Sequence, residues 1–307
     1  MPEVIVVGDV DADQFYIVPH LPVWDEGVLV DEWYEYPGGK GGNTAAALSK
    51  LGIQTGIITS AGDDHYGEVA LEGLRNNGVD LNGVIVVPGG KTYYCIIMLD
   101  STGEKSLLVV LTSLIYPTPQ MVLGKQDILK SARHAHFIGI NPVLMRDSIE
   151  LAKKLGLSIS VDLDAAYQGL EASQPLLTQA DIVFMNQQGA ARLYPGINLH
   201  DAVRAIRYLG PSIVVITMGR QGVIGYDGTN IIEQPAFNLR VQDTTGAGDV
   251  FSAGFVYGHL QGWNLETCLK FSSAAAALST VAIGGQSALP TQSDVWKFIN
   301  ENSSVGL

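Results

Sequence analysis

Short runs of β-branched and other apolar residues alternate with segments of helical periodicity, and this alternation limits the fold more than any other feature of the chain. The apolar runs are Val4 to Val7, Thr55 to Ser60, Phe137 to Ile140, Ser158 to Asp162, Ile182 to Asn186 and Ile213 to Met218. Amphipathic segments that are each followed by a glycine also occur in the chain: Thr44 to Leu51, Tyr66 to Asn77 and Met145 to Leu155. Because such strands suit a sheet covered on both faces, we predict an α/β fold with a central, mostly parallel sheet flanked by helices.

Two regions depart from this alternation, at about residues 15–36 and 83–111. Apolar and polar residues alternate there as in exposed antiparallel strands. We expect these strands to form a small β-sheet lid, inserted in a single domain that spans residues 1–307. Ligands of open α/β sheets bind at the carboxyl ends of the strands, so a lid over that edge would exclude water. Ordinary edge hairpins are the alternative.

The composition limits the partners of the chain. Asp and Glu total 31 against 18 Lys and Arg, and a net charge of −13 would repel a nucleic acid backbone. The longest apolar stretch, around residues 274–283, is too short to span a bilayer, and the first residues lack the basic region of a secretory signal. We expect Cys95 and Cys268 to be buried thiols. These features predict a cytoplasmic protein without a nucleic acid or membrane partner.

The segment from Asp243 to Asp249, with the sequence DTTGAGD, carries the strongest chemical signal because small residues run directly into a long apolar helical pattern. Gly246, Ala247 and Gly248 let a phosphate approach the backbone, and their amides would lie at a helix amino terminus that favours anions. Asp249 is then either a residue that compensates the helix dipole or a catalytic base. As a base it would accept the proton of a hydroxyl while the amides stabilise the transferred phosphoryl group.

Two other segments offer polar groups to a sugar-like ligand. Gly38 to Ala45, with the sequence GGKGGNTA, opens a helical pattern, and Asn43 can both donate to and accept from hydroxyls. A flexible glycine-rich loop is the alternative for this segment. Asp11 and Asp13 follow the first predicted strand, where carboxylates bind paired sugar hydroxyls or a metal ion, or face solvent in a turn.

These motifs resemble those of the ribokinase-like (PfkB) family of carbohydrate kinases, over essentially the whole chain. The segment 243–249 is similar to the carboxyl-terminal signature of that family, and the segment 38–45 is similar to its amino-terminal signature. The resemblance implies a ribokinase-like fold with ATP and Mg²⁺ as cofactors. It also implies that Asp249 is the catalytic base beside an anion hole formed by Gly246, Ala247 and Gly248.

The resemblance implies further site residues by their motif positions. Substrate-facing positions are occupied by Asp11, Asp13, Gly39, Lys40 and Asn43, and Asn141 is a candidate for lining the same pocket. Nucleotide-binding positions are occupied by Asn186, Thr217, Gly219 and Gly222. Many members hold a monovalent cation such as K⁺, which by similarity would involve Asp243, Thr245, Ser279, Ala282 and Gly284.

The sequence departs from the family pattern at two positions. Gly189 stands where the Asn-x-x-Glu motif that begins at Asn186 carries an acid linked to magnesium, so the surroundings of the magnesium ion are expected to differ. The strand that leads to Asn141 lacks the acid that ribokinases place near their substrate, which argues against ribose itself.

We therefore predict ATP-dependent phosphorylation of a hydroxyl of a pentose or hexose. A nucleoside, a phosphorylated or sulfonated sugar, and a non-catalytic sugar or nucleotide sensor are the open alternatives. An anionic substrate would need a cation from among Lys40, Lys91, Lys105, Arg133 and Arg146. The exposed strand edges of the lid predict a homodimer.

Overall fold

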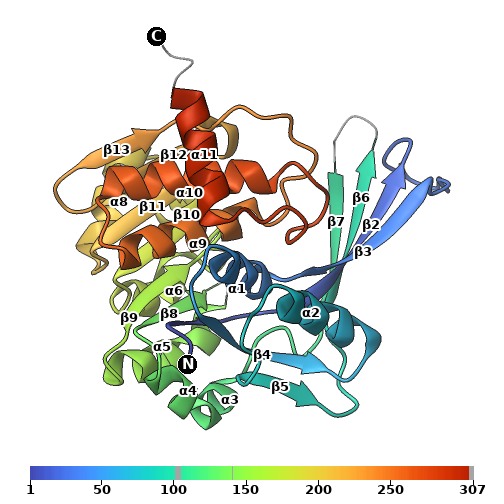
Figure 1. Ribbon diagram of the computed structural model, residues 1–307, viewed down its shortest axis with the longest axis horizontal. Coiled ribbons are helices and arrows are strands. Elements are labelled where there is room, and N and C mark those ends of the chain that lie inside the picture. The colour runs from blue at the N-terminus through green and yellow to red at the C-terminus, as the bar shows by residue number, and fades with distance from the viewer. Residues whose placement is uncertain (101–104, 140, 304–307) are drawn as a thin grey trace.

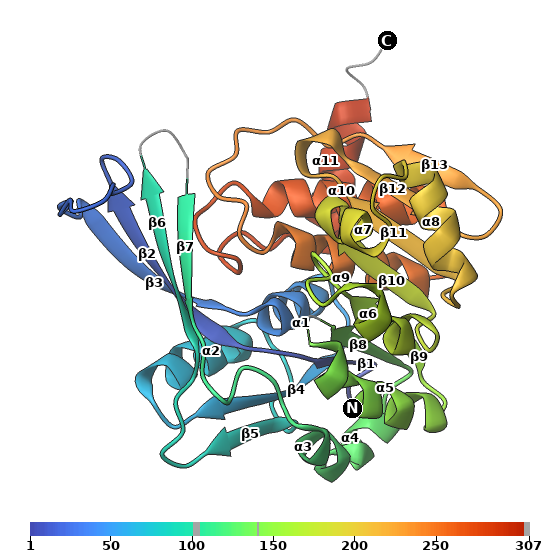
Figure 2. The ribbon, with the colours of Figure 1, turned by 180° about the vertical axis from the view of Figure 1, so that it is seen from behind.

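The computed structural model describes residues 1–100, 105–139 and 141–303. Over these residues the chain forms a nine-stranded sheet with helices on both faces, and a four-stranded sheet projects from one side (Figures 1 and 2). In spatial order the strands of the large sheet are β13 (Ile231–Gln234), β12 (Val223–Tyr226), β11 (Ile213–Thr217), β10 (Ile182–Asn186), β9 (Ser158–Asp162), β8 (His134–Ile138), β1 (Val4–Val7), β4 (Thr55–Gly62) and β5 (Val84–Val87). Neighbours from β11 to β5 pair in parallel, whereas β12 and β13 form an antiparallel edge. The predicted α/β architecture is confirmed.

The alternation of side chains along β1 explains why helices cover both faces of the large sheet. Val4 and Val6 pack in one buried cluster, and Ile5 and Val7 pack in another. The first cluster is covered by α1 (Lys40–Lys50), α2 (His65–Asn76), α9 (Ala247–Leu260), α10 (Leu265–Ser279) and α11 (Gln292–Ser303). The second is covered by α3 (Pro119–Gly124), α4 (Gln126–Lys130), α5 (Pro142–Lys154), α6 (Gly169–Leu177), α7 (Gln187–Leu193) and α8 (Leu199–Tyr208). Among the described helices, none is long and apolar enough to cross a membrane.

One strand boundary differs from the prediction for a clear reason. The strand predicted from Phe137 begins at His134, because His134 and His136 are buried inside β8 and hydrogen bond to Ser158 and Ser160 of β9. The two histidines therefore pack within the sheet, and burial lowers the pKa of His136 to about 3. Residue 140, where the predicted strand ended, lies outside the described residues.

The predicted small sheet is present, but its strand boundaries differ from those predicted. Its strands, in spatial order, are β3 (Glu32–Gly38), β2 (Asp11–Val18), β6 (Tyr94–Asp100) and β7 (Lys105–Val110). β2 begins at Asp11 rather than near residue 15, so the predicted substrate acids lie on the lid strand itself. β5, which falls in the range 83–111, pairs with β4 in the large sheet, and β2 pairs with β6 in parallel rather than antiparallel. Residues 101–104 of that range lie outside the described part of the chain.

Candidate active site

Asp11 and Asp13 bring two carboxyl groups against the backbone of Gly38, which lies opposite Asp11 on the paired strand β3. Both acids are buried, with exposed fractions of 2% and 4%. A Cβ atom at residue 38 would lie 2.2 Å from Oδ1 of Asp11 and 2.5 Å from Oδ2 of Asp13. Glycine is therefore required at this position, because any other side chain would displace both carboxyl groups.

The environment of these two acids favours a neutral, hydroxyl-bearing ligand. Sγ of Cys95 donates to Oδ2 of Asp11 at 3.2 Å, whereas Oδ1 of Asp11 is buried without a hydrogen-bond partner among the described residues. Burial, together with the charges of Asp243 and Asp249, raises the pKa of Asp13 to about 7. Burial and the adjacent acids also raise the pKa of the Cys95 thiol, which makes it a poor metal ligand. Hydroxyl groups fit this cluster better than a metal ion does.

The glycine-rich segment is the first turn of α1 rather than a loop, and the helix begins at Lys40 instead of Thr44. Asp9 causes this early start. Its two carboxylate oxygens each accept one backbone amide, from Lys40 and from Gly41, both at 3.1 Å. The hydroxyl of Tyr93 also donates to Asp9. Gly39 precedes the helix with φ 83, a conformation that side chains rarely adopt. Asp9 therefore holds the first turn of α1 in place, a structural role that the sequence pattern did not reveal.

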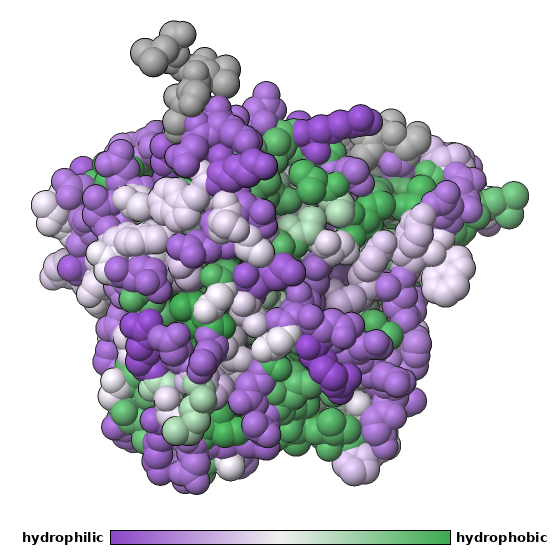
Figure 3. Space-filling view, viewed as in Figure 1, coloured by the Kyte–Doolittle hydropathy of each residue, from purple (hydrophilic) through white to green (hydrophobic). Residues whose placement is uncertain are grey.

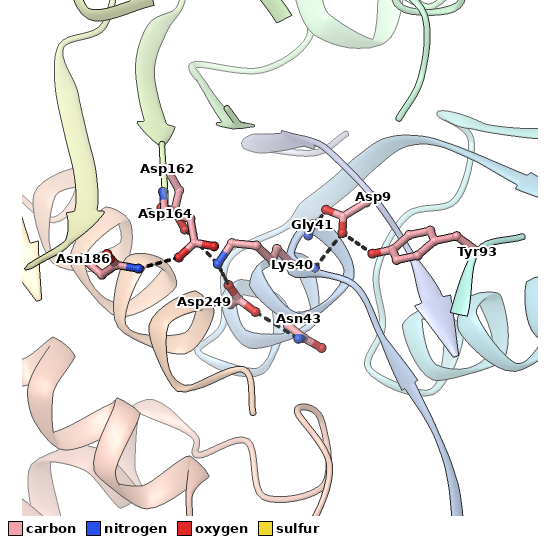
Figure 4. A network of polar contacts seen from close by, with 9 residues as sticks. All are labelled: Asp9, Lys40, Gly41, Asn43, Tyr93, Asp162, Asp164, Asn186 and Asp249. Carbon is pink, nitrogen blue, oxygen red and sulfur yellow. Dashed lines mark hydrogen bonds and ion pairs between the residues drawn. The ribbon is translucent and has the colours of Figure 1, made fainter. Parts of the chain in front are cut away.

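Lys40 joins acids from two distant elements (Figure 4). Its Nζ atom lies 3.0 Å from Oδ1 of Asp249 on α9 and 3.4 Å from Oδ2 of Asp162 at the end of β9. Burial alone would lower the pKa of Lys40, but the charges of Asp162, Asp249 and Asp164 hold it well above the usual value. Lys40 therefore stays protonated and offsets part of the negative charge of the site.

Asp249 lies in the first turn of α9 and is 3% exposed. Nδ2 of Asn43 donates to its Oδ2 at 3.0 Å, and the amide oxygen of Asn43 accepts from Gln286 at 3.3 Å. Burial raises the pKa of Asp249 to about 6, although Lys40 and Asn43 act in the opposite direction. The carboxylate is thus ionised at neutral pH and more basic than an ordinary aspartate, which suits a general base.

A cavity of about 420 Å³ lies beside the start of α9. The predicted nucleotide residues Asn186, Thr217, Gly219 and Gly222 line it together with Ala247 and Gly248. Its remaining lining residues, which the sequence analysis missed, are Arg220, Val223, Ala236, Phe237, Leu239, Val241, Thr244, Phe251, Ser273, Ala276, Ala277 and Thr280. The size and the mainly apolar walls suit a flat base, and Gly248 is exposed at the end where α9 begins.

Comparison with known proteins agrees with this geometry. The model of the pfkB family carbohydrate kinases matches residues 1–292. The chain belongs to this family. The pfkB chain is 29% identical over 302 residues to the ribokinase of Bacillus subtilis. The alignment covers 98% of this chain and 100% of the ribokinase. It is also 29% identical over 311 residues to the ATP-dependent ribose-1-phosphate kinase of Halopiger xanaduensis, with coverage of 98% and 99%.

A solved structure supports the same relationship. The ribokinase of Arabidopsis thaliana, complexed with ribose and ATP, superimposes on the pfkB chain with a TM-score of 0.82 and 26% identity, and covers 97% of this chain and 98% of the other. The protein is therefore a carbohydrate kinase, a phosphotransferase that acts on an alcohol group.

Three of the five residues expected to hold a monovalent cation in this pfkB kinase contact one another, namely Asp243, Thr245 and Gly284. Asp243 is buried, its Oδ1 accepts from the backbone amide and the hydroxyl of Thr245, and its Oδ2 accepts from the amide of Gly284 at 3.0 Å. Ser279 donates its hydroxyl to the carbonyl of Ala276 at the end of α10. Ala282 lies in the segment that joins α10 to Gly284.

Two expected positions of the pfkB kinase have structural roles that the sequence did not reveal. Asn141 caps α5, because its Oδ1 accepts from the amide of Leu144 at 3.3 Å. Gly189 lies on α7, where an added Cβ would be 2.5 Å from the carbonyl oxygen of Asp164. The family acid therefore has no room at residue 189. Asp164, whose carboxylate accepts from Nδ2 of Asn186 at 2.8 Å, is the acid found beside it.

Two of the basic side chains considered as partners of an anionic substrate form ion pairs outside the site. Arg133 pairs with Glu3 at 2.8 Å, and Arg146 pairs with Asp147 at 3.0 Å on the surface of α5. Lys91 is exposed in the connection between β5 and β6. Of the five, Lys40 and Lys105 contact acids of the site, and each is already paired.

Proposed function

We propose that this enzyme transfers the γ-phosphoryl group of ATP to a hydroxyl of a pentose or hexose. The observation that carries the proposal is the position of Asp249 at the start of α9, between the polar groups of α1 and the nucleotide cavity. Asp249 is a buried carboxylate, and its pKa is raised to about 6. An ATP and ribose complex of a relative that is 26% identical supports the choice of both substrates.

The residues of the chain divide the reaction between them. Asp11 and Asp13 accept hydrogen bonds from sugar hydroxyls and fix the sugar beneath the lid. Asp249 removes the proton of the acceptor hydroxyl while the hydroxyl oxygen forms a bond to the γ-phosphorus. The bond from the γ-phosphorus to the oxygen that bridges it to the β-phosphate breaks, and ADP leaves. The backbone of Gly246, Ala247 and Gly248 stabilises negative charge on the transferred group.

The nucleotide cavity supplies the donor. Its apolar walls would hold the adenine, while Asn186, Thr217, Gly219 and Gly222 border the ribose and phosphates. Gly222 has φ 103, and a Cβ there would lie 2.2 Å from the carbonyl oxygen of Gln234. This position therefore accepts only glycine.

Mg²⁺ fits the residues at the boundary between the two sides of the site. Mg²⁺ prefers one or two carboxylates together with water and phosphate oxygens. Asp162 and Asp164 offer carboxylates at the carboxyl end of β9, next to Lys40 and Asn186 (Figure 4). These two acids would hold the ion, whose charge would offset that of the phosphates.

A nucleoside is the second candidate for the acceptor, because apolar side chains border the hydroxyl-binding acids. Val109 and Leu107 of β7 lie opposite Cys95 and Ile97 of β6, and they therefore share the lid face that carries Asp13. They are 47% and 53% exposed, which would suit contact with a nucleobase. Hydrophobic residues gather over the lid in the space-filling view (Figure 3).

The remaining alternatives have less support. The negative charge of a phosphorylated or sulfonated sugar would be unfavourable beside the carboxyl groups of Asp11, Asp13 and Asp249. One relative is nevertheless named a ribose-1-phosphate kinase. A non-catalytic sensor would not need a basic carboxylate at Asp249.

We also propose that the chain acts as one domain with an inserted lid and forms a homodimer through that lid. Trp33 on β3 is 66% exposed and Leu108 on β7 is 54% exposed, which leaves apolar surface for a second copy. Light scattering at micromolar concentration tests this directly. A mass of twice 32.8 kDa is expected, and a monomer would contradict it.

An ADP-release assay over a panel of acceptors tests the proposed function. The panel contains pentoses, hexoses, phosphorylated sugars and nucleosides, each with MgATP. We expect the highest kcat/KM for a neutral sugar or a nucleoside, and a preference for nucleosides would shift the assignment to the second candidate. Release of ADP with none of these acceptors would contradict a sugar kinase.

A further inference from the structure

Lys105 reaches from the lid to the turn before α9, although 138 residues separate it from Asp243. Its Nζ atom lies 3.3 Å from Oδ1 of Asp243, 3.2 Å from the hydroxyl oxygen of Thr245 and 3.4 Å from that of Thr244. These contacts come from the first residue of β7, on the same lid face as the predicted substrate acids. The ammonium group therefore links the lid to the segment that forms the anion hole.

Asp243 needs a positive partner because its side chain is 2% exposed. Its Oδ1 accepts from the amide of Thr245 at 3.0 Å and from the hydroxyl of Thr245 at 2.8 Å, and its Oδ2 accepts from the amide of Gly284 at 3.0 Å. These neutral donors leave the charge uncompensated. A buried carboxylate without a cation is costly, and Lys105 is the cation that the structure places against it.

Some of the oxygen atoms expected to hold a monovalent cation already accept hydrogen bonds within the chain. Oδ1 of Asp243 accepts from the amide and the hydroxyl of Thr245, and Oδ2 of Asp243 accepts from the amide of Gly284. The carbonyl oxygen of Gly284 accepts from the amide of Ser287 at 3.2 Å. With the Lys105 ammonium also at Oδ1 of Asp243, this set of residues does not fit a separate K⁺ ion well.

We propose that Lys105 is a positioning residue that supplies, from the lid, the cation for Asp243, so that the turn from residue 243 to 248 is ordered without a separate monovalent cation. This inference rests on the proposed kinase function. It links closure of the lid to formation of the anion hole, because the same side chain belongs to one and contacts the other.

The contact also connects the turn with the sugar side of the site. The negative charge of Asp243 contributes to the raised pKa of Asp13, and the positive charge of Lys105 opposes it. Removal of the Lys105 charge is therefore expected to disturb the sugar acids as well as the phosphate turn.

Chemical rescue tests the proposal. Lys105→Met keeps the apolar stem and removes the charge, whereas Lys105→Arg keeps the charge. Lys130→Met is the matched control, because Lys130 forms an exposed pair with Asp127 at 3.0 Å outside the site. Each protein is assayed in ammonium chloride and in tetramethylammonium chloride at equal ionic strength, since ammonium mimics the lost group and tetramethylammonium is too large.

In tetramethylammonium chloride we expect Lys105→Met to lose about tenfold or more in kcat/KM, and ammonium to restore most of the loss. Lys105→Arg is expected to retain more activity than Lys105→Met. The wild type and Lys130→Met are expected to show the same activity in both salts. Stimulation of the wild type by ammonium or K⁺, or a Lys105→Met enzyme that does not respond to ammonium, would overturn the proposal.

Thermal unfolding without substrates separates this inference from the proposed function. Ammonium is expected to raise the Tm of Lys105→Met and to leave the Tm of the wild type unchanged relative to tetramethylammonium. If this pattern appears while no acceptor is phosphorylated, the kinase assignment fails and the role of Lys105 at Asp243 stands. If Lys105→Met does not fold, Lys105→Gln replaces it, and the indifference of the wild type to the two salts remains decisive.

Discussion

Nδ2 of Asn43 lies 3.0 Å from Oδ2 of Asp249, although 206 residues separate them in the chain. The contact joins the first turns of α1 and α9, two helices that each begin after a glycine with positive φ. Folding therefore brings together the two glycine-rich motifs that the sequence shows far apart. The proposed base Asp249 and the proposed substrate-binding residue Asn43 therefore occupy one site.

Asn43→Ala is expected to raise the pKa of Asp249, because the hydrogen bond from Asn43 lowers it. The acid limb of the kcat/KM profile should move to higher pH, and kcat/KM near pH 6 should fall more than kcat/KM near pH 8. Steady-state assays across this range measure the shift. Asn302→Ala, whose side chain donates to Phe298 on the terminal helix, is the control. A parallel drop at all pH values would contradict the electrostatic role.

The pH dependence of the wild type follows from raised pKa values in the site, about 6 for Asp249 and about 7 for Asp13. Burial and the charges of Asp13 and Asp9 also raise the pKa of Asp11 well above its usual value. Asp249 and Asp13 act as carboxylates, so kcat/KM should fall as the pH decreases through this range, well above the pKa of an ordinary aspartate. Because more than one proton is taken up, the acid limb should be steeper than for one group. Asp13→Asn is expected to make the acid limb less steep. Full activity of the wild type at pH 5 would contradict these assignments.

Gly38→Ala is expected to weaken sugar binding. Its Cβ would displace Asp11 and Asp13, so the KM for the sugar should rise by about tenfold or more while the KM for ATP changes little. Gly124→Ala is the matched control, because an added Cβ there has no atom within 4 Å. Equal KM values for the two variants would show that the acids do not depend on the glycine.

Much of this site could be predicted because its key residues belong to short motifs. Asp249, Gly246 and Asn43 sit where a run of small residues opens an apolar helical pattern, a signal that is local in sequence. The mostly parallel sheet was predictable for a similar reason, since each apolar run carries its own pattern.

The contacts made by isolated residues could not be predicted in the same way. Asp162 and Lys105 are single charged residues without a motif, and their partners lie far away along the chain. The position of Asp162 at the end of a predicted strand was a usable signal, because ligands bind at that edge. Asn141 also follows a predicted strand, but its side chain caps a helix. A position at the end of a strand therefore does not by itself distinguish a residue of the site from a helix cap.

Restoring the family acid by Gly189→Glu is expected to harm the enzyme. The new Cβ would lie 2.5 Å from the carbonyl oxygen of Asp164 and would disturb the pairing of Asp164 with Asn186. We expect a loss of about 1–3 kcal/mol in the free energy of unfolding and a higher KM for MgATP. Gln188→Glu adds the same charge at an exposed neighbour and should have little effect. A gain of activity in Gly189→Glu would contradict the role given to Asp164.

The central claim is that Asp249 removes the proton of the acceptor hydroxyl. The most direct measurement compares wild type and Asp249→Asn, with turnover measured by ADP release and sugar affinity by calorimetry. We expect turnover to fall by about a hundredfold or more while the affinity for the sugar changes only a few-fold. Equal turnover of the two proteins would contradict the account.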